Sequence, residues 1–213
     1  MLKDIKNVER YTHLMTRCHY AVSFKYILPY VRDRCVLDLG SGTGEYLADF
    51  GRDSVGIDAS ILNLQKLREK ELMGVRADLD DRLPFKSESF EAIFCSHILE
   101  HVDAPIHLLR ESNRVVKRGG YIVIALPFEK SLIRLILRDH YFKDHPTHFY
   151  SFSLDCLKQL LEKSAFFYCK SFVDIPGAKR FHLAPLMDFA QHLPFWLSRW
   201  FSGNFWVVGQ KIS

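Results

Sequence analysis

The stretch CVLDLGSGTGEY, residues 35–46, decides the fold of this chain. An apolar run leads to Asp38, and three glycines then alternate with small polar residues. Glycine lets the backbone turn sharply and approach a ligand that a β-carbon would repel. A buried strand followed by such a turn is typical of α/β sheets that bind a ligand at the carboxyl ends of their strands. The question is which ligand this turn holds.

The pattern around this stretch alternates short β-rich runs with helical ones. Strands are expected at residues 35–39, 54–58, 74–78, 90–96 and 121–127. Helices are expected at residues 44–50, 60–72 and 104–117, with Ser60 placed as the N-cap of the second. Connections this short predict a mostly parallel sheet with helices on both faces, and right-handed crossovers make it a doubly wound, Rossmann-like three-layer sandwich.

The whole chain of 213 residues is expected to form a single domain. Its expected parts are an N-terminal helical cover, the core, an aromatic insert and a last strand, at residues 1–31, 32–176, 177–203 and 204–213. Within the core, Ser153 is expected to cap a helix that precedes a strand at residues 166–175.

Composition places the chain among globular proteins. The net charge of +4 is mild and no run of four basic residues occurs, so nucleic acid is not an expected partner. Five scattered cysteines without a C-x-x-C pair fit reduced thiols. The charged N-terminal stretch and the lack of a long apolar run predict no signal peptide and no transmembrane segment. We therefore expect a cytoplasmic location.

The turn itself favours a ligand with a positive centre. Its spacing is G-x-G-x-G, whereas the dinucleotide fingerprint has G-x-G-x-x-G, and Glu45 stands near where a pyrophosphate would lie. The phosphate-binding G-x-x-x-x-G-K-[ST] loop is absent. Asp58 ends the second strand, where a carboxylate can accept the hydroxyls of a ribose; alternatively it caps the next helix. Asp78 could meet an adenine amino group, or be a solvated loop acid.

Four segments together resemble the class I S-adenosylmethionine-dependent methyltransferases, in their small-molecule branch. They are VLDLGSGTGEY, VGIDAS, RADLDDRLPFKSESFEAIFCSHILEHV and ESNRVVKRGGYIVIALP, in the family's order and spacing. The resemblance covers about residues 30–165 and implies a seven-stranded sheet with an antiparallel last strand. It implies S-adenosylmethionine as the cofactor. The residues implied to hold it are Asp38, Gly40, Ser41, Gly42, Thr43, Gly44, Asp58, Ala59, Asp78, Leu79, Ser96 and His97.

The acceptor side is less defined. His145 and His148 lie among aromatic residues in DHYFKDHPTHFYSFS, a stretch that commonly folds over the active site in this family. They are the catalytic or acceptor-contact candidates, because histidine has an unperturbed pKa of ~6.5; alternatively they only fix the loop. His97 and His101 have the spacing of a metal pair, but no third ligand of matching spacing is evident, so no metal is expected. Glu100 and His101 are expected to tie their loop to the helix that follows.

The predicted function is methyl transfer from S-adenosylmethionine to an unidentified small or lipid-like acceptor. The alternatives are an RNA or protein methyltransferase and a non-catalytic S-adenosylmethionine-binding regulatory protein; a nicotinamide enzyme is more distant. CSHI replaces the Asn/Asp-Pro-Pro-Tyr/Phe sequence of enzymes that methylate adenine or glutamine. The insert 177–203 could form an acceptor pocket, contact a membrane surface, join two copies or pack as a helical pair. The protein is expected to be a monomer or a homodimer.

Overall fold

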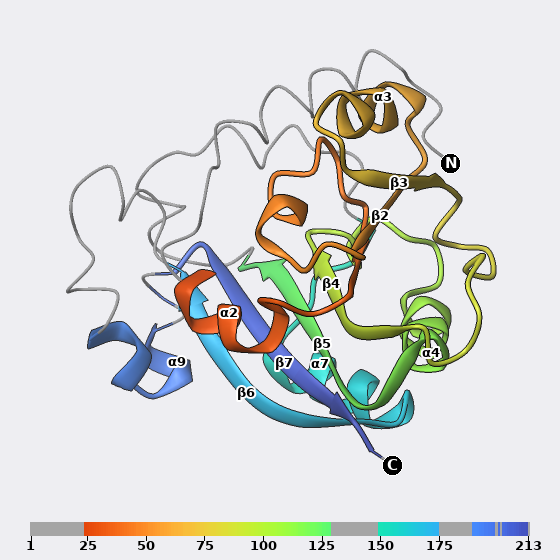
Figure 1. Cartoon of the computed structure of the whole chain (residues 1–213). Helices are drawn as coiled ribbons and strands as arrows, with labels where there is room; N and C mark the ends of the chain where they lie inside the picture. Colours follow the sequence, from red (N-terminus) through yellow and green to blue (C-terminus); the bar gives the residue numbers. More distant parts are fainter. Residues whose placement is uncertain (1–23, 129–148, 175–188, 199, 201, 213) are drawn as a thin grey trace.

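The computed structural model describes residues 24–128, 149–174, 189–198, 200 and 202–212 (Figure 1). Its centre is a seven-stranded sheet in the order β3-β2-β1-β4-β5-β7-β6. The strands are β1 (Val36–Leu39), β2 (Val55–Asp58), β3 (Met73–Arg76), β4 (Phe90–Ser96), β5 (Val116–Pro127), β6 (Phe166–Asp174) and β7 (Asn204–Lys211). Strand β7 is antiparallel to both of its neighbours, β5 and β6, and the other pairings are parallel. The expected doubly wound sheet with an antiparallel last strand is confirmed.

Helices cover both faces of the sheet, which makes three layers (Figure 1). The helices are α2 (Phe24–Val31), α3 (Ile61–Glu69), α4 (Pro105–Val115), α7 (Leu154–Lys163) and α9 (Phe195–Ser198), with the 3₁₀ helix η1 (Leu47–Asp49) after the glycine turn. The expected helix at 44–50 is therefore only a 3₁₀ turn. Helix α4 ends at Val115, because β5 begins at Val116, earlier than its expected start at residue 121.

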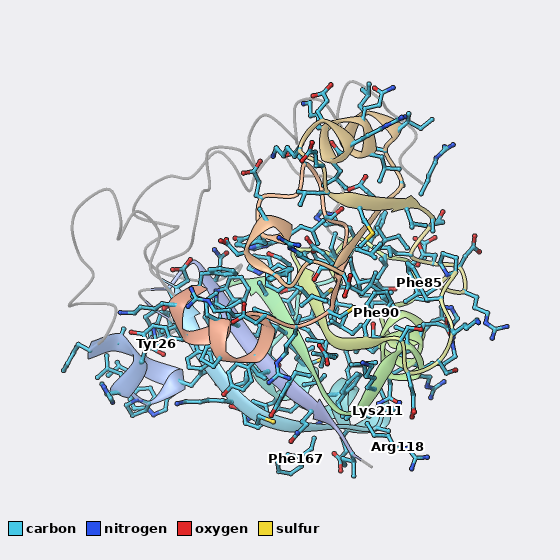
Figure 2. All side chains as sticks on the ribbon, viewed as in Figure 1. Tyr26, Phe85, Phe90, Arg118, Phe167 and Lys211 are labelled. Atoms are coloured by element: carbon cyan, nitrogen blue, oxygen red, sulfur yellow. The ribbon has the colours of Figure 1, made fainter. Side chains whose placement is uncertain are left out.

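Two cores result, one on each face of the sheet. Side chains of α4 and α7 pack with Leu37, Leu39 and Ile93 on one face, and α2 packs with Val36 and Phe94 on the other. Successive residues of β1 thus point to opposite faces, as strand geometry requires. Figure 2 shows side chains on both sides of the sheet. Tyr26 of α2 stacks on Phe172 of β6, with 5.4 Å between the ring centroids.

Helix starts were well predicted. The hydroxyl of Ser60 accepts a hydrogen bond from the backbone N–H of Asn63 at 3.4 Å, and that of Ser153 accepts one from Cys156 at 3.1 Å. Both serines satisfy a helix N–H that has no partner within the helix. The first cap sets α3 directly behind the end of β2, and so helps to position the candidate site.

Candidate functional site

The turn after β1 is held by backbone hydrogen bonds to β2. The N–H groups of Gly40 and Ser41 both donate to the carbonyl of Ile57, at 2.8 and 3.0 Å. Gly40, Gly42 and Gly44 have φ values of +67°, +54° and +77°, a region that disfavours any residue with a β-carbon. At Gly40 a β-carbon would also clash with the side chain of Ile98. The loop after β4 therefore packs directly on the first glycine of the turn.

Asp38 lies just before this turn and is almost fully buried. Its residue is 3% exposed, and no residue in the described part of the chain donates a hydrogen bond to its carboxylate. Burial raises its pKa well above the usual value, and the nearby charge of Asp58 raises it further. A buried carboxylate without donors is costly unless a cation accompanies it. The site is therefore prepared for a positively charged group.

Asp58 has more structural contacts than the sequence indicated. Its Oδ2 accepts from the N–H of Gly42 at 2.9 Å, and its Oδ1 accepts from the N–H of Ser60 at 2.8 Å and the amide of Asn63 at 3.2 Å. Burial raises its pKa, and these three hydrogen bonds oppose the rise. Asp58 thus joins the glycine turn to the start of α3, a structural role that goes beyond the helix cap considered as the alternative to ribose binding. A carboxylate has about four acceptor positions, so one is left for a ligand hydroxyl.

The far end of the turn contains a basic residue that sequence analysis missed. Lys70, which follows α3, donates to the carbonyl of Thr43 at 2.7 Å and to Glu45 at 3.2 Å. The hydroxyl of Thr43 also donates to Glu45, at 2.7 Å. Glu45 thus forms an ion pair with Lys70. Because the positive charge of Lys70 offsets its negative charge, Glu45 would repel a bound phosphate less than the sequence indicated. The sequence holds no signal for this contact, because Lys70 lies a whole helix away.

Two further predicted residues follow the next strand of the sheet. Strand β3 pairs with β2 so that Arg76 lies opposite Asp58, and Asp78 is two residues beyond. Asp78 is exposed, and its Oδ1 accepts only from the N–H of Asp80, at 3.1 Å, among the contacts that the structure describes. Leu79 packs partly buried against the main core, and Ala59 is exposed beside β3. Both Asp58 and Asp78 therefore lie at the same edge of the sheet.

A histidine and a glutamate meet after β4. The Nδ1 atom of His97 lies 3.3 Å from Oε1 of Glu100, and Ser96 and His97 are both partly buried. His97 has a φ of +56°, uncommon for a residue other than glycine. The expectation that Glu100 ties this loop to α4 is wrong for its carboxylate. Asp80 instead accepts the N–H groups of Asp103 and Ala104 ahead of that helix, at 2.8 and 3.2 Å.

The proposed catalytic histidines, His145 and His148, lie outside the described residues. The chain is described again from Phe149, whose N–H donates to the carbonyl of Glu100 at 2.8 Å. The hydroxyl of Tyr150 donates to the carbonyl of Asp103 at 2.9 Å. The residues that directly follow His148 in sequence are thus attached to the loop after β4.

Most of the aromatic insert 177–203 is also outside the described residues. In its described part, the side-chain amide of Gln191 pairs with both backbone groups of Val173, at 3.0 and 2.8 Å. Phe195 packs on Phe128 with ring centroids 5.4 Å apart, whereas Trp196 is largely exposed. None of the helices described here is long and apolar enough to cross a membrane. Nor does the described part contain three clustered His, Cys, Asp or Glu side chains able to hold a metal ion.

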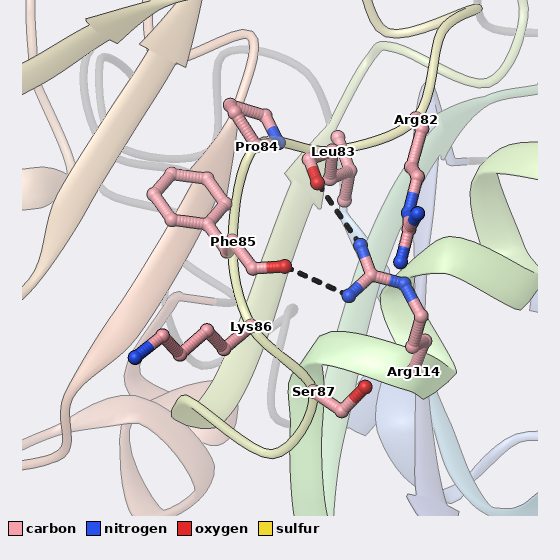
Figure 3. Close-up of a pocket in the computed structure, with 7 residues that line it drawn as sticks. All are labelled: Arg82, Leu83, Pro84, Phe85, Lys86, Ser87 and Arg114. Atoms are coloured by element: carbon pink, nitrogen blue, oxygen red, sulfur yellow. Dashed lines mark hydrogen bonds between the residues drawn. The ribbon is translucent and has the colours of Figure 1, made fainter.

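A separate open hollow of about 500 Å³ lies between the loop before β4 and helix α4 (Figure 3). Arg114 crosses it and donates to the carbonyls of Leu83 and Phe85, at 2.9 and 2.7 Å. The same guanidinium pairs with Glu111, at 2.6 Å. These contacts fasten the loop to α4, and the glycine turn contributes no residue to the hollow. We therefore assign the hollow a structural role.

Comparison with known proteins fits this geometry. A family profile described as a methyltransferase domain matches residues 37–124. An uncharacterised protein of Methanocaldococcus jannaschii is 34% identical over 42% of this chain and 43% of its own length. A demethylmenaquinone methyltransferase of Renibacterium salmoninarum is 39% identical over 42% of this chain and 40% of its own. This chain thus spans less than half the length of either of these relatives.

Solved structures extend the similarity over nearly the whole fold. A methyltransferase of Haloferax volcanii, in complex with the Trm112 methyltransferase activator, superposes with a TM-score of 0.70 at 20% identity, over 97% of this chain and 94% of its own. Residues 37–124 are therefore similar to a methyltransferase domain, and the fold is that of solved S-adenosylmethionine-dependent methyltransferases, a class whose cofactor is S-adenosylmethionine. The site residues fit this cofactor, because a buried, donor-free Asp38 beside a glycine turn suits its ammonium group.

Proposed function

We propose that this protein transfers the methyl group of S-adenosylmethionine to a small or lipid-like acceptor. The observation that carries the proposal is the pair of buried carboxylates, Asp38 and Asp58, on either side of a glycine turn at the ends of adjacent parallel strands. Asp38 and the backbone of the turn from Gly40 to Gly44, including Ser41 and Thr43, would hold the methionine end of the cofactor. Asp58 and Ala59 would meet the ribose.

The remaining predicted residues would complete the site. Asp78 and Leu79 would flank the adenine, and Ser96 and His97 would line the side of methyl transfer. The bound cofactor supplies an electrophilic methyl group on a sulfonium. The chain's own contribution is to align the acceptor and to exclude water. His145 and His148 stay proposed acceptor-side residues, and a cytoplasmic location and a monomeric or homodimeric state stay predictions.

An apolar acceptor is supported by aromatic residues near the site. Phe149 and Tyr150, attached to the loop after β4, expose much of their side chains. The R. salmoninarum relative is named for an apolar quinone acceptor, although it shares under half of either chain. An RNA acceptor is less favoured, because the net charge is only +4.

Calorimetry of the purified chain tests the donor part of this proposal. S-adenosylmethionine and S-adenosylhomocysteine should bind, and NAD should not. Binding of NAD alone would overturn the proposal at its base. The Gly40→Ala variant is the binding-deficient control.

An acceptor screen tests the transferase part. The chain is incubated with S-adenosylmethionine carrying a tritiated methyl group and with phenols, quinols, fatty acids or unmodified tRNA. Label in a small apolar acceptor supports the proposal, and label in tRNA alone favours the RNA alternative. Cofactor binding without any transfer across a broad panel favours the regulatory alternative.

A further inference from the structure

The contact between His97 and Glu100 satisfies only one of the two carboxylate oxygens of Glu100. Glu100 is 1% exposed, and its Oε1 meets Nδ1 of His97 at 3.3 Å. Its Oε2 is buried and has no hydrogen-bond partner in the described part of the chain. A buried carboxylate oxygen without a donor is costly and needs an explanation.

Glu100 is ionised at neutral pH despite this burial. Burial by itself raises its pKa, but the hydrogen bond from His97 and the charges that His97 and His101 carry when protonated outweigh burial and lower the pKa overall. The thiol of Cys95 is also close to Glu100. Burial, Glu100 and Asp38 all raise the pKa of that thiol, so Cys95 is neutral.

The charge of Glu100 determines which ring nitrogen of His97 carries a proton. An ionised carboxylate can only accept hydrogen bonds, so Nδ1 of His97 must donate in this contact. In a neutral imidazole the other nitrogen, Nε2, then has the free electron pair. The side chain of His97 is 23% exposed, so part of it can be reached from outside the core.

The position of His97 places it beside the cofactor turn. It directly follows β4, whose Cys95 pairs with Leu39 of β1. The next residue, Ile98, fills the space that a β-carbon of Gly40 would need. The N–H of His97 donates to the carbonyl of Ala125 in β5 at 3.0 Å. This hydrogen bond holds His97 in its left-handed backbone conformation.

We propose that His97 accepts the proton of the methyl acceptor, an O–H or N–H nucleophile, and that Glu100 is its positioning residue. This role rests on the proposed function. The acceptor's oxygen or nitrogen uses an electron pair to form the bond to the methyl carbon, and the sulfur–methyl bond breaks with its pair left on sulfur. The acceptor's proton passes to Nε2 of His97 and then to solvent. Positioned bases of this kind contribute about 10²–10⁴-fold to rates.

The first test needs no acceptor, only the full chain labelled with ¹⁵N-histidine and observed by NMR. The His97→Asn variant identifies the His97 signal, and asparagine tolerates the left-handed backbone. We expect the Nδ1–H tautomer in the wild type, a change of that signal when S-adenosylhomocysteine binds, and loss of the tautomer preference in Glu100→Gln. The control His107→Gln, on α4, should leave the signal unchanged.

Two outcomes would overturn the role of His97 alone: an Nε2–H tautomer, or a His97 signal that bound S-adenosylhomocysteine does not change. Failure of the wild type to bind S-adenosylhomocysteine would instead overturn the proposed function, and this role with it. Where the acceptor screen yields a substrate, His97→Asn should lower kcat about 100-fold or more. Its affinity for S-adenosylhomocysteine should fall far less than kcat, because the proton is transferred only during the reaction.

Discussion

The turns after β1 and β4 lie side by side at the carboxyl ends of paired strands, yet they consist of different kinds of residue. The turn after β1 uses glycines and backbone N–H groups, and its only buried charges come from the strand ends at Asp38 and Asp58. The turn after β4 uses a histidine in a left-handed conformation and a buried glutamate. The exposed backbone of the glycine turn can bind a cofactor but cannot take up a proton, whereas the side chains of His97 and Glu100 can. The comparison suggests that cofactor binding and acceptor activation are divided between the two turns.

The largest effect is expected for Gly40→Ala, because it would strain the first turn and push it against the second. The left-handed φ of +67° and the close approach of Ile98 both oppose a β-carbon. Together we expect a loss of about 2–5 kcal/mol in the free energy of unfolding, from backbone strain and overpacking. Urea unfolding and calorimetry with S-adenosylhomocysteine measure the loss of stability and of binding.

Gly42→Ala is the matched control for that change. Its φ is +54°, but no atom lies within 4 Å of the added carbon, so only backbone strain of about 1–2 kcal/mol is expected. Equal losses in both variants would show that packing between the two turns contributes nothing.

Asp38→Asn removes the charge of the first turn while keeping its shape. We expect cofactor affinity to fall by about 1.5–3 kcal/mol, the size of a lost hydrogen bond to a charged group. The unfolding free energy of the free protein should not fall, because the buried charge has no described donor. A variant that loses stability but binds S-adenosylhomocysteine normally would give Asp38 a structural role.

The raised pKa of Asp38 also makes binding depend on pH. Between the unfolded value of about 3.9 and the raised folded value, the folded state keeps a proton that the unfolded state has lost, so stability falls as pH rises. Asp58 contributes with the same sign. A bound ammonium group would lower the pKa of Asp38, so S-adenosylhomocysteine should release a proton on binding within this pH range. Calorimetry in two buffers of different ionisation enthalpy measures that release, and Asp38→Asn should abolish most of it.

Asp58→Ala separates the binding role of the first turn from its structural one. We expect cofactor affinity to fall by about 1–3 kcal/mol, and stability to fall as well because three hydrogen bonds are lost. Calorimetry well below the melting temperature keeps the two effects apart. Unchanged affinity with reduced stability would remove Asp58 from the ribose site and leave it as a link between the turn and α3.

The sequence predicted the sheet and the first turn well, because both depend on local patterns. Apolar runs located all seven strands, and the glycines of residues 40–44 needed no tertiary information. The long-range contacts were not predictable: Lys70 reaches Thr43 across a helix, and Asp80 holds the start of α4. The pairing of His97 with Glu100 needed the left-handed backbone at residue 97, which no sequence pattern indicated. A contact between one or two side chains produces no repeating pattern in the sequence, so it cannot be read from periodicity or spacing.

The smallest effect is expected for Ser60→Ala, which tests whether the first turn depends on the helix behind it. Loss of an N-cap costs about 1 kcal/mol of stability, and the long 3.4 Å contact of Ser60 places it at the low end of that range. Ser153→Ala is the matched control, because it removes the same kind of cap from α7, a helix that supplies none of the predicted cofactor residues. Only Ser60→Ala should also weaken S-adenosylhomocysteine binding, by a few-fold, since fraying of α3 loosens the hydrogen bonds that Ser60 and Asn63 donate to Asp58. Equal binding in both variants would mean that the contact between Asp58 and Gly42 is enough to hold the carboxylate in place.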